Sequence, residues 1–135
     1  MASTIDLRTE TVGVVPSSGI RAHSVLKASF DASKVSGGLV SGNTYKFLTI
    51  PEKFLLRNVE IRVRGADAAA GTSTLTDGAI VPLAAQVMNV VGMFYGTTNL
   101  PKYYADGGYL AGLIATADIT TAIFDVIAEG IDLRE

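Results

Sequence analysis

Two carboxylates near the end of the chain are the first candidates for catalysis. Asp125 and Glu129 lie four residues apart in an alternating stretch, Ile119–Leu133, whose pattern predicts a strand and puts both acids on one face. Paired carboxylic acids hydrolyse glycosides when they stand about 5–10 Å apart. Four residues of strand span about 13 Å. We therefore predict that Asp125 and Glu129 are surface or interface charges.

The other reactive residue types form no catalytic or metal-binding pattern. His23 is the one histidine, and no Gly-x-Ser-x-Gly sequence presents a serine to it. The absence of cysteine excludes thiol catalysis and zinc–thiolate sites. The glycines match neither the phosphate-binding loop nor the dinucleotide fingerprint. We expect no enzymatic activity, no metal and no cofactor.

Three aspartates fall in predicted loops or turns. Asp67, Asp77 and Asp106 have small neighbours, but none belongs to a twelve-residue calcium loop with acids at the required offsets. Aspartate in a turn commonly accepts hydrogen bonds from nearby backbone amides. We predict this structural role for all three.

Arg57, Arg62 and Arg64 form a basic stripe on a predicted strand. Only Phe54 lies nearby to stack on a base, and the net charge of the chain is -2. We therefore do not expect a nucleic-acid partner. The stripe is interpreted as an ion-pairing face, and the acids that it pairs could belong to this chain or to a partner surface.

Charge is distributed unevenly along the chain. Residues 1–64 hold nine Lys and Arg against five Asp and Glu, whereas residues 65–135 hold two against eight. Strands from the two halves could alternate in one sheet and cancel locally. Alternatively, opposite faces could meet head-to-tail in a ring of subunits.

Short alternating segments separated by turn residues predict an all-β single-domain antiparallel sandwich or jelly-roll-like barrel. In the clearest strand, Phe54–Arg64, Val59, Ile61 and Val63 alternate with charged residues. Leu83–Val91 has apolar residues at helical spacing and is the one short helix predicted. The predicted strands are Ile20–Phe30, Thr44–Ile50, Phe54–Arg64, Thr72–Thr76, Tyr109–Ile114 and Ile119–Leu133; Ser33–Asn43, Ala66–Gly71 and Thr97–Lys102 are predicted loops.

The segment Gly78–Pro101 contains no charged residue. Pro82, Gln86, Asn89 and the glycines interrupt it too often for a membrane span, so we predict a buried or interface segment and no membrane contact. Tyr95, Tyr103, Tyr104 and Tyr109 crowd one region of sequence. They could form a carbohydrate-stacking patch or a subunit interface.

Residues 1–19 are predicted to form an extended N-terminal arm, and residues 20–135 the β-rich domain. The arm alternates weakly and ends in Pro16-Ser17-Ser18-Gly19. Its start lacks a basic region followed by an apolar stretch, so we expect no secretory signal.

The order of these parts resembles that of head decoration (cement) proteins of tailed bacteriophages. The resemblance is carried by Thr49-Ile50-Pro51 before the Leu55–Arg64 strand, by Thr72–Thr76 with Asp77-Gly78, by Tyr103–Tyr109, by Ile114–Asp118 and by Ile123–Leu133. It implies a non-enzymatic, often trimeric protein, made in the host cytoplasm and carried on the capsid surface of the virion. Such a protein clamps neighbouring copies of the major capsid protein, frequently through an N-terminal arm.

On this hypothesis the apolar residues of the arm contact the capsid, and the charged strand residues lie at interfaces. The expected contact residues are Ile5, Leu7, Val12, Val14 and Val15 of the arm, with Arg57, Arg62, Arg64, Asp125 and Glu129. The alternative function is a phage tail or fibre adhesin, a carbohydrate-binding β-module that uses the tyrosines.

Overall fold

The computed structural model describes residues 3–8, 12–14 and 23–133. These residues contain eleven β-strands and one turn of 3-10 helix, Ala32–Lys34. The strands are β1 (Thr4–Asp6), β2 (Val12–Val14), β3 (His23–Asp31), β4 (Thr44–Ile50), β5 (Phe54–Gly65), β6 (Thr72–Thr76), β7 (Leu83–Val87), β8 (Gly92–Gly96), β9 (Lys102–Tyr104), β10 (Gly108–Ala115) and β11 (Ile123–Asp132).

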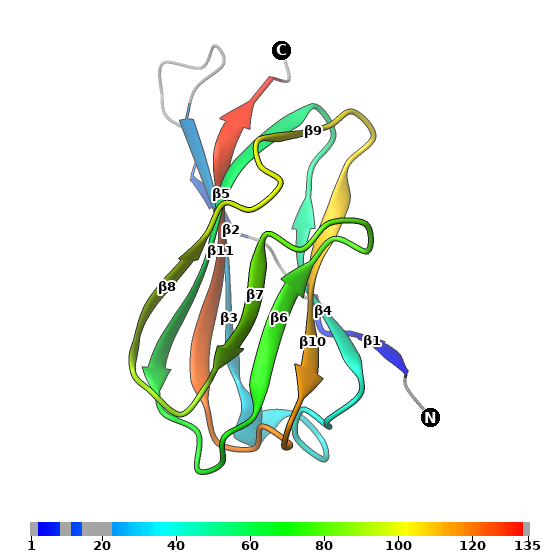
Figure 1. Ribbon diagram of the computed structural model, residues 1–135. Helices are drawn as coiled ribbons and strands as arrows, with labels where there is room; N and C mark the ends of the chain where they lie inside the picture. Colours follow the sequence, from blue (N-terminus) through cyan, green and yellow to red (C-terminus); the bar gives the residue numbers. More distant parts are fainter. Residues whose placement is uncertain (1–2, 9–11, 15–22, 134–135) are drawn as a thin grey trace.

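The strands form two sheets packed face to face (Figure 1). Sheet A has the order β1-β4-β10-β6-β7, and sheet B has the order β2-β3-β11-β5-β8 with β9 added to β5. Neighbouring strands of the described residues are antiparallel, apart from the parallel pair β1 and β4. The predicted all-β antiparallel sandwich is confirmed.

From β3 onward, the chain passes repeatedly from one sheet to the other. Strands β3, β5, β8 and β11 belong to sheet B, and β4, β6, β7 and β10 belong to sheet A. The resulting orders, β3-β11-β5-β8 and β4-β10-β6-β7, are those of a jelly roll, in which eight strands form two Greek keys. Because most successive strands are in different sheets, residues far apart in sequence become neighbours.

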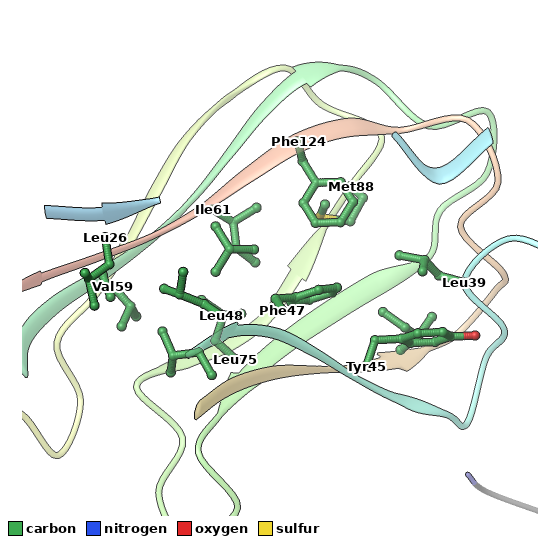
Figure 2. Close-up of a cluster of buried hydrophobic side chains, with 14 of the residues drawn as sticks. Leu26, Leu39, Tyr45, Phe47, Leu48, Val59, Ile61, Leu75, Met88 and Phe124 are labelled. Atoms are coloured by element: carbon green, nitrogen blue, oxygen red, sulfur yellow. The ribbon is translucent and has the colours of Figure 1, made fainter. Parts of the chain in front are cut away.

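The core lies between the sheets and follows from the alternation of the strands. Val59, Ile61 and Val63 of β5 are buried, as predicted. Figure 2 shows side chains from both sheets filling the space between them. Phe47 of sheet A packs against two rings of sheet B, with its centroid 4.9 Å from that of Phe30 and 5.5 Å from that of Phe124. These aromatic contacts stabilise the packing of the two sheets in addition to the stabilisation that comes from burying the rings.

A register shift allows two consecutive residues of β4 to face the core. Leu110 pairs with Leu48 and Ala111 with Lys46, so Phe47 is an extra residue on the β4 side. Both Phe47 and Leu48 are buried, which strict alternation would not allow. The irregularity therefore adds a large aliphatic side chain to the core.

The predicted helix over Leu83–Val91 is wrong. Residues Leu83–Val87 form β7, which pairs antiparallel with β6, and β8 begins at Gly92. The stability of an isolated nine-residue helix is marginal in water, whereas residues 83–87 gain backbone hydrogen bonds by pairing with the edge of β6. Met88, the residue after β7, is buried, and its N–H donates to the carbonyl of Gly71.

Several predicted boundaries also shift, and two of the shifts affect the connections between strands. The predicted loop Thr97–Lys102 ends one residue earlier, because Lys102 begins β9, which pairs with the start of β5. The predicted strand Ile119–Leu133 begins at Ile123. Ile119 instead forms an isolated bridge with Leu39, which ties the middle of the 33–43 loop to the segment before β11.

The described part of the N-terminal segment adds one edge strand to each sheet. β1 pairs with β4, and β2 pairs with β3. Ile5 lies opposite the inward-facing Tyr45, and both Ile5 and Leu7 are partly buried against the core of their own domain. Val12 and Val14 belong to β2, whereas Val15 lies outside the described residues. A contact between these residues and a partner stays a prediction.

Two strand glycines provide a test of the packing. A Cβ added to Gly130 would meet the backbone of Leu55 and the Phe54 ring, whereas one added to Gly65 would lie 3.3 Å from the Cβ of Ile123. We expect Gly130→Ala to lower the free energy of unfolding by about 2 kcal/mol or more, and Gly65→Ala by less than about 1 kcal/mol. Urea unfolding measures both. Equal losses would contradict the packing described for β5 and β11.

Candidate interaction surfaces

The most buried charge of sheet B is Asp125, on the outer face of β11. Arg64 donates to it with Nε at 3.2 Å and Nη2 at 3.1 Å, and the Lys27 ammonium lies 3.7 Å away. The Asp125 side chain is only 1% exposed, because these two long side chains cover it. Asp125 is therefore satisfied within its own chain.

The arginine stripe is partly an internal ion-pairing face, as one of the two interpretations predicted. Arg62 Nε donates to Glu60 at 3.0 Å, and Arg64 pairs with Asp125. Arg57 is exposed, and Glu129 is half-buried. Arg62 and Arg64 are thus committed to acids of this chain, and of the stripe Arg57 is the most available to a partner.

The uneven charge of the two halves is cancelled locally at this site. β11, from the acidic half, lies between β3 and β5, both from the basic half. Lys27 of β3 and Arg64 of β5 consequently reach Asp125 of β11 from either side. This is the arrangement that alternating strands predicted, and the head-to-tail ring stays a prediction.

Asp77 ties the β6–β7 turn to β9. Its Oδ1 accepts from the amides of Ala79 and Ile80 at 2.8 Å each, and its Oδ2 accepts from Lys102 Nζ and from Tyr104 Oη. Burial alone would raise the pKa of Asp77, but these donors, the Ile80 amide foremost, hold it at about 2. The sequence predicted the bonds to the turn, but not those to Lys102 and Tyr104.

Asp67 has a similar structural role between two loops. Its Oδ1 accepts from the amides of Thr120, Thr121 and Ala122, and its Oδ2 accepts from the amide of Ala69. Burial acts to raise the pKa of Asp67, and the backbone amides more than offset it, so the pKa is lowered. The predicted bonding to nearby backbone is confirmed for Ala69, and the bonds to the distant 120–122 loop were not foreseen.

The four tyrosines do not form one patch. Tyr104 is buried. Tyr109 lies in sheet A beside the end of β4, where Lys46 Nζ is 4.6 Å from the centroid of its ring. Tyr95 and Tyr103 are exposed on sheet B. Tyr95 pairs with Glu60 and Tyr103 with Leu55, so both side chains project from the outer face. Any carbohydrate-stacking patch is therefore limited to these two rings.

Charged side chains fix β1 to sheet A. The Arg8 guanidinium forms a two-point contact with Asp6, with Nη2 at 2.6 Å, and Nη1 lies 3.4 Å from Thr49 Oγ1. The hydrogen bonds from Arg8 lower the pKa of Asp6 well below its ordinary value. The edge at β1 therefore carries both a positive and a negative charge.

The uncharged segment Gly78–Pro101 forms the opposite side of the sandwich. It contains β7 and β8, the outermost strands of sheets A and B, and the turn between them (Figure 1). The two edges approach at Gly96, where an added Cβ would meet Leu83. Five of the eight exposed large hydrophobic residues of the described chain lie here, namely Val81, Val90, Val91, Met93 and Tyr95. We call this surface the uncharged side.

The sequence identified this segment as buried or interfacial but did not place it. Alternation within each short strand gave no indication that β7 and β8 end their sheets. Among the described residues, no helix is long and apolar enough to cross a membrane. The described chain also brings no three His, Cys, Asp or Glu residues together as a metal-binding group.

Comparison with known proteins adds no family assignment. No protein-family model matches the chain, and no curated protein matches it either.

The Arg64–Asp125 pair predicts that replacing two arginines of β5 lowers the free energy of unfolding by different amounts. Arg64→Ala leaves the buried Asp125 carboxylate with Lys27 as its remaining cation, and we expect it to lower the free energy of unfolding by about 2 kcal/mol. Arg57→Ala removes an exposed charge and should change it by less than about 0.5 kcal/mol. Chemical denaturation of both variants checks this. Equal effects would show that Asp125 does not depend on Arg64.

The Asp77 cluster predicts an acid-dependent loss of stability. The pKa of Asp77 in the folded protein is about 2, below its ordinary 3.8, so the stabilisation is complete above pH 4 and is lost between pH 4 and pH 2. The shift corresponds to about 2 kcal/mol. Asp77→Asn should lower stability at pH 7 by a similar amount and flatten the profile between pH 4 and pH 2. An unchanged slope in urea melts across this range would contradict the assignment.

Proposed function

We propose that this chain is a non-enzymatic structural protein of a phage virion, which binds the outer surface of the capsid and holds neighbouring capsid subunits together. The observation that carries the proposal is the uncharged side. A 135-residue body with a filled core leaves two strand edges without charge and with exposed aliphatic and aromatic side chains. Surfaces of this kind are characteristic of proteins that function in contact with a partner.

The fold supports the same proposal by analogy. Jelly rolls of eight strands are the architecture of viral capsid domains and also of lectins. A fold alone does not assign a function, but here it agrees with the resemblance in the order of sequence elements.

Stabilisation of the shell would follow from binding the assembled capsid and not its separated subunits. Mass action then raises the free energy required to take the shell apart. Because a capsid repeats the same site many times, several weak contacts from one oligomer combine into tight binding. No chemical step is needed.

The N-terminal segment is our proposed contact with the major capsid protein. Among the described residues, β1 and β2 each pair with the body over three residues, and β1 is also held by bonds from Leu7 and Arg8. Short edge strands of this kind can be exchanged for pairing with a partner strand when the partner replaces these contacts. Ile5 and Leu7 would then leave the edge of the core and pack against the capsid, together with Val12, Val14 and Val15.

A second candidate, a carbohydrate-binding adhesin module, is favoured by Tyr95 and Tyr103. Both rings are exposed on the outer face of sheet B, and lectins share the jelly-roll architecture. Binding on a glycan array that is lost in Tyr95→Ala/Tyr103→Ala would favour this candidate over the capsid.

Cosedimentation with expanded capsids that lack the protein tests the main proposal. We expect saturable binding by the full chain, and at least tenfold weaker binding by a variant without residues 1–15, because the variant lacks the proposed contact. Circular dichroism establishes whether the shortened chain keeps its strands.

The results for the full chain and for the shortened chain test different parts of the proposal. Failure of the full chain to sediment with capsids contradicts the capsid function itself. Unchanged binding by a folded shortened chain contradicts only the role of the N-terminal segment.

A further inference from the structure

The chain contains two Asp-Gly pairs, Asp77-Gly78 and Asp106-Gly107, and no Asn-Gly pair. An aspartate side chain can react with the backbone nitrogen of the next residue, and glycine leaves that nitrogen least obstructed because it has no Cβ. Both glycines have a positive φ, 97° at Gly78 and 80° at Gly107. The sequence and the conformation of the glycines therefore do not distinguish the two pairs.

The surroundings of Asp77 hold its carboxylate in place. The side chain is 2% exposed, and its two oxygens accept hydrogen bonds from two amides of the turn, from Lys102 and from Tyr104. The nitrogen of Gly78 is also occupied, because it donates to Thr76 Oγ1 at 3.0 Å. Rotation of the Asp77 carboxyl group toward Gly78 would break these bonds in a buried site, and each donor left unpaired there raises the free energy.

Asp106 has none of these restraints. It is exposed, and its carboxylate has no hydrogen-bond donor or cation among the described residues, so the bonds predicted for it in its turn are absent there. Two long backbone hydrogen bonds hold the turn, one from Gly107 N to the carbonyl of Tyr104 at 3.4 Å and one from Lys53 N to that of Ala105 at 3.3 Å. Both are longer than the usual distance of about 2.9–3.0 Å and are correspondingly weak.

We propose that Asp106-Gly107 is a site at which this chain forms isoaspartate, and that Asp77-Gly78 is protected from the same reaction. In the first step the nitrogen of Gly107 bonds to Cγ of Asp106, whose carboxyl group reacts in its protonated form. The C–O bond to the hydroxyl breaks, and the hydroxyl leaves with the proton of the nitrogen as one molecule of water. The product is a five-membered succinimide ring.

Water then opens the ring at one of its two carbonyl carbons. Addition at Cγ breaks the new bond to the nitrogen and restores aspartate. Addition at the backbone carbonyl carbon of Asp106 breaks the original peptide bond to Gly107, so the chain continues through Cγ and the former backbone carbonyl becomes the free carboxylate. The backbone of the turn is then one methylene longer. Water is the one co-reactant that these steps need.

The modification would fall on a connection between the two sheets. Residues 105–107 join β9 of sheet B to β10 of sheet A, whose first residue, Gly108, pairs with Ile50 of β4. Gly107 lies close to the same strand end, since an added Cβ would be 2.9 Å from the carbonyl oxygen of Ile50. A longer backbone must therefore shift this turn. The inference is independent of the capsid and carbohydrate functions proposed above.

The experiment stores the purified full chain at physiological temperature and neutral pH, with a second sample unfolded in urea. An isoaspartate-specific carboxyl methyltransferase with S-adenosylmethionine labels the product, and peptide mass spectrometry locates the label. In the folded protein, isoaspartate should accumulate at least about tenfold faster at residue 106 than at residue 77, because the bonds of Asp77 raise the barrier to its reaction. In urea the two rates should agree within about twofold, since the unfolded chain lacks these bonds.

Asp106→Glu is the matched control. It keeps the exposed carboxylate, but the longer side chain would have to close a six-membered ring. We therefore expect no labelled product at residue 106 of this variant and the same low rate at Asp77 as in the wild-type protein. Comparable rates at the two aspartates of the folded wild-type chain, or a product at residue 106 that forms in urea but not in the folded chain, would each overturn the proposal.

Discussion

A sheet in water must protect the backbone amides and carbonyls of its outermost strands, and this requirement governs how the protein is built. Each of the two sheets has two ends. On one side the N-terminal segment supplies short strands, and at β1 the pair of Asp6 and Arg8 adds charge. On the other side, β7 and β8 end the sheets without any charge. This asymmetry is the reason for our proposal that the uncharged side is a contact surface.

The charged residues act mainly inside the chain. Asp125, Asp77 and Asp67 each join elements that are distant in sequence: Asp125 joins β11 to β3 and β5, Asp77 joins the β6–β7 turn to β9, and Asp67 joins two loops. Buried carboxylates stabilise a fold when every oxygen has a donor, as these do. Several acids and cations of the described chain are committed in this way to contacts within the chain, whereas others, such as Glu52, Arg57 and Asp106, are exposed.

Local pattern was sufficient for much of the fold and insufficient for its edges. The alternation of Val59, Ile61 and Val63 predicted both the strand and its buried face, because period-two burial needs no knowledge of neighbours. The helix predicted at Leu83–Val91 failed because pairing with β6 outweighs weak helical spacing. The distant partners of Asp67 and Asp77 could not be predicted, since they come from loops and strands that only the jelly-roll order brings close. For the same reason, the sequence found the uncharged segment but not its position.

Hydrogen exchange at β8 tests the central claim most directly, namely that the uncharged side is covered when the protein functions. Amides of residues 92–96 should exchange at least tenfold more slowly in concentrated or assembled protein than after dilution, while those of β10 in the middle of sheet A should not change. Equal exchange of β8 in both conditions, with its edge as accessible in the assembly as in dilute solution, would contradict the account.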